Sequence, residues 1–344
     1  MDKFDTSENK VTYLLGAGAS VKGLPTVKPT SVSNGLAKAL SDFAQMFEND
    51  KSVSSSNDEF VKEMVGDLRW LATNSEKFGT TDTFAKFLYL KDRNSLLRLK
   101  LALSFYFTVE QFLNDKKDDR ALIFLTTVME YGQVFPRNIK ILSWNYDFQI
   151  EIAAEVFRKE EYHPAFITAA TPPLINYYPG LGNALLNNDV RNITMIHLNG
   201  IAGYFFYEPS QTHLSLFFNK PPENINEIIK GITLDKNKKH HLLTFAWEEE
   251  TDSAIFLNKR IEYATSLVED TDIFVIIGYS FPYFNRSIDS QIFNALQKSG
   301  RLKKIYYQDP ARSGDFLKNQ FAISKDIEII PVSDTSNYFV PNEL

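Results

Sequence analysis

The chain has 344 residues, of which 44% are hydrophobic and 23% are charged, and its net charge at pH 7 is −6. This length and this balance are typical of a globular protein with one large domain or two smaller ones. There is no cysteine, which excludes disulfide bonds, thiolate metal sites and a cysteine nucleophile. Lys and Arg residues are scattered singly, so the sequence lacks the basic patch of a dedicated nucleic-acid-binding protein.

The sequence also argues against secretion and membrane insertion. No uninterrupted apolar run reaches the length of about 18 residues that a transmembrane helix needs, and residues 1–10 lack the apolar core of a signal peptide. We therefore expect a cytoplasmic protein without a membrane partner, which binds a small molecule or another protein.

The first predicted element is an apolar strand, Val11–Leu15, which ends in a glycine-rich turn formed by Gly16, Ala17, Gly18 and Ser20. Glycines let the backbone approach a pyrophosphate closely, and the amides at the start of a following helix can bind it. The turn has two of the three glycines of a dinucleotide-binding fingerprint, and glycine-rich turns without ligands are common. Both interpretations stay open on this segment alone.

Residues 32–135 change to helical periodicity. The apolar pattern predicts helices near residues 36–47, 61–71, 84–90, 96–113 and 122–131, with a polar interruption at residues 51–58. We interpret this block as a helical insertion between the first two strands of a sheet, and we expect it to cover one side of a ligand cleft. Its aromatic residues at 105–107 and 112 are expected in the core or in oligomer contacts.

The sheet resumes with a strand at residues 139–142, which runs directly into Asn145 and Asp147. In an open parallel sheet, ligands bind beyond the carboxyl ends of the strands, so these two side chains are candidate site residues. The alternative is structural. An Asn or Asp side chain can cap the first turn of the helix that the apolar pattern predicts next, to about residue 159.

The middle of the chain gives weaker signals. Prolines predict an irregular connection over residues 160–189, and a short strand at residues 193–196 ends at His197. The pattern then predicts a hairpin-like pair at residues 203–207 and 213–218, a charged loop at 234–241 and a helix at 253–267.

The last third has the clearest alternation of strands and helices. A strand at residues 272–277 breaks at Gly278 and Ser280, and a helix capped by Asn285 is predicted at residues 286–298. The elements predicted after it are a strand at 302–307, a short helix at 316–321 and a strand at 327–332. Parallel strands would bring both glycine turns, Asn145 and His197 to one crevice. We therefore predict an α/β fold: a Rossmann-like parallel sheet with helices on both faces and the large insertion, in a single domain over residues 1–344.

Four short motifs occur in a fixed order along nearly the whole chain: GAGAS and GLP from Gly16, WNYD from Trp144, IHLNG from Ile196, and GYSFPYFNRSID from Gly278. This series resembles the sirtuin-like NAD-binding family, particularly its bacterial branch of NAD hydrolases that act in antiphage defence. The resemblance implies a catalytic domain that uses NAD as its substrate.

The resemblance also implies roles for individual residues. Those implied to hold the pyrophosphate are Gly16, Ala17, Gly18 and Ser20. Asn145 would lie beside the nicotinamide ribose, Asp147 would contact the carboxamide, and His197 would be the base. The adenosine half is implied to lie against Gly278 and Ser280, with Asp309 as a contact to the adenine ribose.

The chain departs from the sirtuin deacetylases at three points. Trp144 stands where a deacetylase usually has Gln, the paired CxxC zinc module is absent, and no acyl-lysine-binding segment is recognisable. These departures argue against protein deacetylation and leave cleavage of NAD, without a metal, as the expected reaction.

We expect an NAD hydrolase that yields nicotinamide and ADP-ribose and depletes NAD in antiphage defence. Breaking the bond between nicotinamide and ribose needs positioning and a proton acceptor for water more than covalent help. The alternatives are a module that senses NAD or ADP-ribose without cleaving it, and an ADP-ribosyltransferase. Since no separate sensor segment is evident, we expect a homo-oligomer, a partner sensor or ATPase protein, or both.

Overall fold

A computed structural model describes residues 9–130, 135–157, 175–178, 193–207, 212–215, 222–233, 239–248 and 254–344. Its main sheet is built from seven strands, which are β1 (Val11–Leu15), β2 (Ile139–Ser143), β3 (Tyr177–Tyr178), β4 (Met195–His197), β8 (Ile273–Ile277), β9 (Lys304–Gln308) and β10 (Glu328–Val332). All pairs of neighbours in this sheet are parallel. The predicted α/β fold with a parallel sheet is therefore confirmed.

The strand order is β10-β9-β8-β1-β2-β4-β3. The chain builds outward from β1 through β8, β9 and β10 on one side, whereas on the other side β3 precedes β4 in the sequence but lies outside it. The order reverses at β1, which pairs with β2 on one side and with β8 on the other. In open α/β sheets, ligands bind beyond the carboxyl ends of the strands at such a reversal point. The topology alone therefore predicts a ligand site beyond the ends of β1, β2 and β8.

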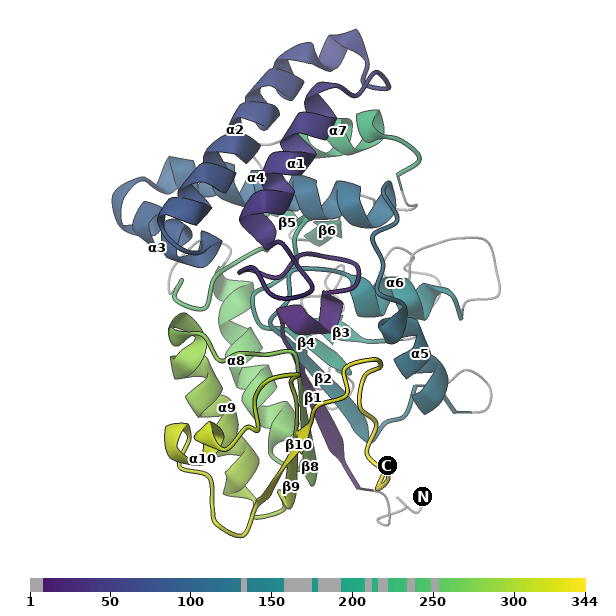
Figure 1. The fold of residues 1–344 in the computed structure, drawn as a ribbon, viewed down its shortest axis with the longest axis vertical. Helices are drawn as coiled ribbons and strands as arrows, with labels where there is room; N and C mark the ends of the chain where they lie inside the picture. Colours follow the sequence, from purple (N-terminus) through teal and green to yellow (C-terminus); the bar gives the residue numbers. More distant parts are fainter. Residues whose placement is uncertain are drawn as a thin grey trace.

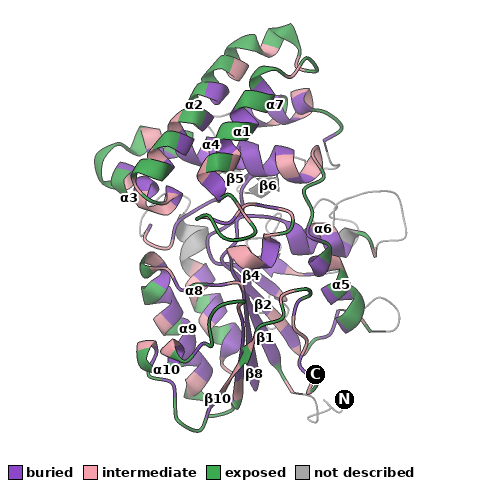
Figure 2. Ribbon diagram, viewed as in Figure 1, coloured by how far each residue is buried: buried purple, intermediate pink, exposed green. Residues whose placement is uncertain are grey.

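Helices cover both faces of the sheet (Figure 1). One face packs against α8 (Ala254–Val268), α9 (Arg286–Lys298) and α10 (Phe316–Gln320), and the other faces α5 (Asp119–Val128) and α6 (Gln149–Glu155). Because side chains alternate along a strand, Tyr13 and Leu14 enter different apolar clusters on the two faces. Both faces of β1 are buried (Figure 2), as the unbroken apolar sequence of this strand predicts.

The helical insertion lies between β1 and β2 in the sequence and begins with α1 (Leu36–Glu48), α2 (Asp58–Lys77), α3 (Thr81–Lys91) and α4 (Arg93–Phe112). These four helices, with α7 (Ile225–Thr233), stand beyond the end of the sheet at which β1 meets the short 3₁₀ helix η1 (Ala17–Ser20) (Figure 1). Two further 3₁₀ turns are η2 (Ser55–Asn57) and η7 (Tyr283–Asn285). Phe105 and Tyr106 are buried, as expected for core residues.

A small antiparallel sheet contains β5 (Tyr204–Tyr207), β6 (Thr212–Ser215) and β7 (Lys239–His241). The predicted hairpin is confirmed, whereas the charged loop was predicted wrongly at residues 239–241, which pair with β5. The two-residue β3 lies inside the predicted irregular connection, most of which is outside the described residues. Within the described ranges, no helix combines the length and the apolar character that crossing a membrane requires.

Candidate functional site

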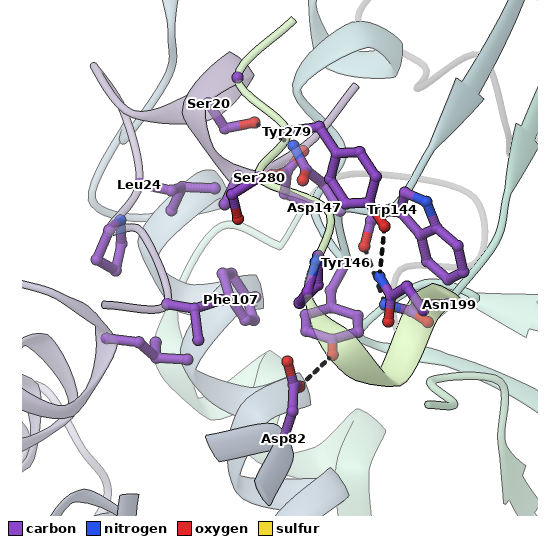
Figure 3. A pocket seen from close by; sticks show the side chains of 18 residues that line it. Ser20, Leu24, Asp82, Phe107, Trp144, Tyr146, Asp147, Asn199, Tyr279 and Ser280 are labelled. Carbon is purple, nitrogen blue, oxygen red and sulfur yellow. Dashed lines mark hydrogen bonds between the residues drawn. The ribbon is translucent and has the colours of Figure 1, made fainter. Parts of the chain in front are cut away.

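A cavity lies beyond the carboxyl ends of β1, β2, β4 and β8 (Figure 3). The space between its walls, including the part that opens to solvent, is about 730 Å³. Its lining residues are Ala17, Ser20, Leu24, Pro25, Val27, Leu36, Asp82, Phe107, Trp144, Asn145, Tyr146, Asp147, Asn199, Gly278, Tyr279, Ser280, Pro282 and Asn285. The insertion contributes Leu36, Asp82 and Phe107, so it forms one wall of this cavity.

The strand register explains which residues reach the cavity. The level ends of the four strands are Leu15, Ser143, His197 and Ile277. The second residue after each of these positions lines the cavity, giving the set Ala17, Asn145, Asn199 and Tyr279. Because the strands are parallel and in register, equivalent positions beyond their ends converge on the same space.

The two glycine turns pack directly against each other. A Cβ on Gly16 would lie 2.6 Å from the Tyr279 Cα, and a Cβ on Gly18 would lie 2.7 Å from the Gly278 Cα. The Gly18 amide donates to the Gly278 carbonyl at 2.9 Å, and the Gly16 amide donates to Ile277 at 3.0 Å. The glycines are therefore explained by this close packing, and the turn presents Ala17 and Ser20 to the cavity.

Asn145 joins the end of β2 to the glycine turn. Its side-chain amide donates to the Gly16 carbonyl and to the Ser20 hydroxyl, both at 3.0 Å. The side chain is 8% exposed and lines the cavity. Asn145 does not cap α6, because this helix begins four residues later, at Gln149.

Asp147 meets the start of α6 and also lines the cavity, whereas the N-cap residue of α6 is Phe148. One carboxylate oxygen accepts the Gln149 amide at 3.3 Å at the start of α6, and the side chain also lines the cavity. Burial raises the pKa of Asp147 to about 6, although hydrogen bonds from Ser20 and Gln149 lower it. Near neutral pH this carboxylate can therefore exchange a proton readily.

His197 is placed differently from what a base in the cavity requires. Its side chain is fully buried on the sheet face covered by α6 and is absent from the cavity lining. The Nε2 atom lies 2.5 Å from Glu151 Oε1, and Nδ1 lies 3.5 Å from the Asn145 carbonyl oxygen. Burial lowers the pKa of His197, but the charge and hydrogen bond of Glu151 outweigh burial and raise it overall.

Asn199, two residues after His197, reaches the cavity in its place. Its side-chain NH₂ donates to the Trp144 backbone carbonyl at 3.1 Å, and the backbone carbonyl of Asn199 accepts the Thr244 amide at 2.8 Å. Sequence reasoning missed this residue, although its position two residues after the strand end is the same as that of Asn145.

A buried carboxyl group fixes two aromatic walls of the cavity. Asp289 accepts the Trp144 indole N–H at 3.1 Å and the Tyr279 hydroxyl at 2.8 Å. The two rings lie with centroids 6.1 Å apart and planes at 17°. Asn285 is the N-cap residue of α9, as predicted, but its side chain donates to the Tyr279 hydroxyl and makes no capping hydrogen bond. Burial raises the pKa of Asp289 to about 8.

Asp82 connects the insertion to the sheet across the cavity. It lies in the first turn of α3, and one of its oxygens accepts the Tyr146 hydroxyl at 3.0 Å (Figure 3). Burial raises the pKa of Asp82, although the Tyr146 hydrogen bond lowers it. Asp82 was not predicted as a site residue, because its only sequence signal was its place near the start of a predicted helix.

Arg120 supports the glycine turn from behind. Its guanidinium donates to the carbonyls of Gly18 and Ala19 at 3.1 Å and forms a buried ion pair with Asp118. The Tyr338 hydroxyl also donates to Ala19, at 2.6 Å. These contacts fix the turn before any ligand arrives.

Of the predicted site residues, the structure brings Ala17, Ser20, Asn145, Asp147, Gly278 and Ser280 to the cavity. Gly16 and Gly18 lie just behind it. Asp309 is outside the lining, and it accepts the amides of Ala311 and Arg312 at 2.9 Å within its own loop.

The electrostatic character of the cavity is acidic and aromatic. Asp82 and Asp147 line it, and none of the described lining residues is Lys, Arg or His. Arg312 contacts one of the lining residues, donating to the Ser280 carbonyl at 3.3 Å. Within the described ranges, no group of three His, Asp or Glu side chains is arranged to hold a metal ion. A scan of protein-family models finds no match to this chain, and a search of curated proteins finds none either.

Proposed function

We propose that the protein hydrolyses NAD to nicotinamide and ADP-ribose. The observation that carries this proposal is a cavity at the reversal point of a parallel sheet, lined by two carboxylates and four aromatic rings and by no described cationic side chain. Such a lining suits the positively charged nicotinamide ring of NAD, because carboxylates and aromatic faces both attract a cation.

The proposed reaction breaks the bond between nicotinamide and the anomeric carbon of the ribose. The bonding electron pair leaves with nicotinamide, which becomes neutral, and positive charge develops on the sugar. The buried carboxylate of Asp147 stabilises this charge. A water oxygen then bonds to the anomeric carbon, and its proton passes to Asp147, whose pKa of about 6 suits a base near neutral pH.

In this proposal the base is Asp147, and His197 is a positioning residue. The His197 ring contacts the Asn145 carbonyl, and the Asn145 side chain holds the Gly16 carbonyl and the Ser20 hydroxyl. Ser20 in turn bonds Asp147, so His197 acts on the reacting carboxylate through the backbone and through Asn145.

The dinucleotide's other half would lie along the two turns. Ala17 and Ser20 would contact the pyrophosphate, with Gly278 and Ser280 beside the adenosine. Arg312 at the edge supplies the positive charge that the described lining lacks. The resemblance of the four motifs extends the proposal to NAD depletion in antiphage defence, controlled by oligomer formation or by a separate sensor or ATPase protein.

Incubation of the purified protein with NAD, with nicotinamide release followed by chromatography, tests the proposal. Asp147→Asn is the matched variant, because it keeps the size of the side chain and removes the proton acceptor. Release by the wild-type protein and loss in the variant are expected. Equal release by both proteins would contradict the assignment of Asp147.

A second candidate function is favoured by the burial of His197. A cavity without an imidazole among its described lining residues also suits a module that binds NAD or ADP-ribose without cleaving it. Saturable NAD binding by calorimetry, with no nicotinamide released in the presence of candidate activating proteins, would support this function over hydrolysis.

A further inference from the structure

One polar atom in the cavity wall has no partner. The Oδ1 atom of Asn199 is buried and accepts no hydrogen bond from any described residue. The side chain as a whole is 7% exposed and lines the cavity (Figure 3). Buried amide oxygens are nearly always hydrogen-bonded in folded proteins, so an unpaired one on a residue that lines the cavity calls for a donor from a ligand.

The orientation of this oxygen is fixed by its surroundings. The Trp144 carbonyl can only accept, so the Asn199 group that meets it at 3.1 Å must be the NH₂, and the oxygen must point the other way. The Asn199 backbone is held by the Thr244 amide. The next residue, Gly200, has φ of +65°, and a Cβ there would lie 1.6 Å from the Leu242 carbonyl oxygen.

The neighbouring cavity residues do not supply the missing donor. Both amide hydrogens of Asn145 are bonded to the glycine turn, and the Tyr146 hydroxyl donates to Asp82. The Trp144 indole N–H donates to Asp289. The oxygen is therefore a rigid acceptor among groups whose hydrogens are already used.

We infer that Asn199 is a specificity-determining residue whose Oδ1 accepts an N–H or O–H of the bound ligand. This inference rests on the proposed function and deepens it. NAD offers such donors from two sources near its reacting bond, which are the carboxamide NH₂ and the hydroxyls of the nicotinamide ribose. A pocket built to accept a hydrogen bond rejects a ligand that lacks the donor far more strongly than an apolar pocket does.

The experiment compares three ligands by calorimetry on the full-length protein: NAD, its 3-acetylpyridine analogue, which lacks the carboxamide N–H, and NAD with a 2′-deoxy nicotinamide ribose. The wild-type protein should bind NAD at least about 100-fold more tightly than one of the two analogues. In Asn199→Leu this preference should fall to within about threefold, because the variant no longer accepts the donor. The analogue affected identifies which donor Asn199 recognises.

Two further variants keep the test independent of folding. Asn199→Asp in its neutral form can donate its O–H to the Trp144 carbonyl and accept with its other oxygen, so it should retain the preference when binding is measured below the pKa of the new carboxyl. Asn199→Ser, which is too short to reach, should lose the preference. A merely structural role would weaken all three ligands equally and leave their ratio unchanged, which would overturn the inference. Failure of NAD to bind the wild-type protein would overturn the inference and the proposed function together. If Asn199→Leu binds all three ligands without the wild-type preference and the wild-type protein releases no nicotinamide, the result would contradict hydrolysis and support the role of Asn199.

Discussion

The ends of β2 and β4 lie level in the sheet, yet they place their polar residues differently. Ser143 pairs with His197 in the register, so both are the last residues of their strands. The side chain of His197 is still governed by strand geometry and lies on the face that α6 covers, where Glu151 meets it. Asn145 and Asn199, two residues further, have left the strands and reach the cavity.

This difference distinguishes residues that line the cavity from residues that support it from behind. Asp147 lies in the cavity, where burial raises its pKa more than the hydrogen bonds from Ser20 and Gln149 lower it. His197 lies beneath the site, and the charge of Glu151 raises its pKa despite burial. In β2 and β4, the polar residues that reach the cavity therefore lie beyond the last paired position.

The largest expected effect is the loss of turnover in Asp147→Asn. Nicotinamide release should fall by about 10²–10⁴-fold, the usual contribution of a positioned general base. Because burial disfavours the native carboxylate, the same change should raise the free energy of unfolding at pH 7 by on the order of 1–2 kcal/mol. Initial rates and urea unfolding of the same preparations measure both effects. A variant that loses activity and stability together would place Asp147 with the supporting residues.

His197→Ala should destabilise the protein, whereas Asp147→Asn should stabilise it. Removing the imidazole leaves the buried Glu151 carboxylate without its partner, which should lower the free energy of unfolding by about 3–5 kcal/mol. The double variant His197→Ala/Glu151→Ala should cost less than the sum of the two single changes, since the residues are in contact. Urea unfolding of all four proteins gives the coupling. A His197→Ala protein of unchanged stability but without turnover would restore the histidine as the base.

The two residues should also differ in their dependence on pH. Turnover should fall about tenfold per unit as the pH drops below 6, because protonation of Asp147 removes the base. The pKa of His197 is raised in the folded state, so its stabilising contribution is complete below its ordinary pKa of about 6.5 and is lost as the pH rises through the raised value. Rate profiles and unfolding curves across pH 5–8 measure the two effects, and a turnover that increases on acidification would contradict the role of Asp147.

The sequence predicted the sheet well because its central strands are buried on both faces and therefore apolar throughout. The helix over residues 286–298 was also located correctly, since its apolar residues recur with helical spacing. Strands β3 and β7 were missed, because two or three residues carry too little pattern and their pairing comes from distant partners. The predicted boundaries of the single domain stay a prediction.

The site was predictable in part for a similar reason. Ala17, Ser20, Asn145 and Asp147 could be predicted because each follows an apolar run closely in the sequence, and all four line the cavity. Asn199 was missed because the sequence pattern favoured His197, the first polar residue after the predicted strand, as the site residue instead. Asp82 required the position of the insertion above the sheet, which is determined by tertiary packing.

The smallest expected effect concerns Asp309, which the family resemblance implied as a contact to the adenine ribose. Its carboxylate accepts two amides of its own loop, and one of these belongs to Arg312, whose guanidinium meets the Ser280 carbonyl. Asp309→Ala should therefore leave nicotinamide release at saturating NAD unchanged. It should raise KM no more than about threefold, because Arg312 would be held less firmly. Removal of a direct hydrogen bond to a ribose hydroxyl would raise KM further. Arg312→Ala is the matched control, because it removes the cation and leaves the Asp309 carboxylate in place. If Asp309→Ala raises KM well beyond Arg312→Ala, the carboxylate contacts the ligand directly, and the loop must move toward the cavity when NAD binds.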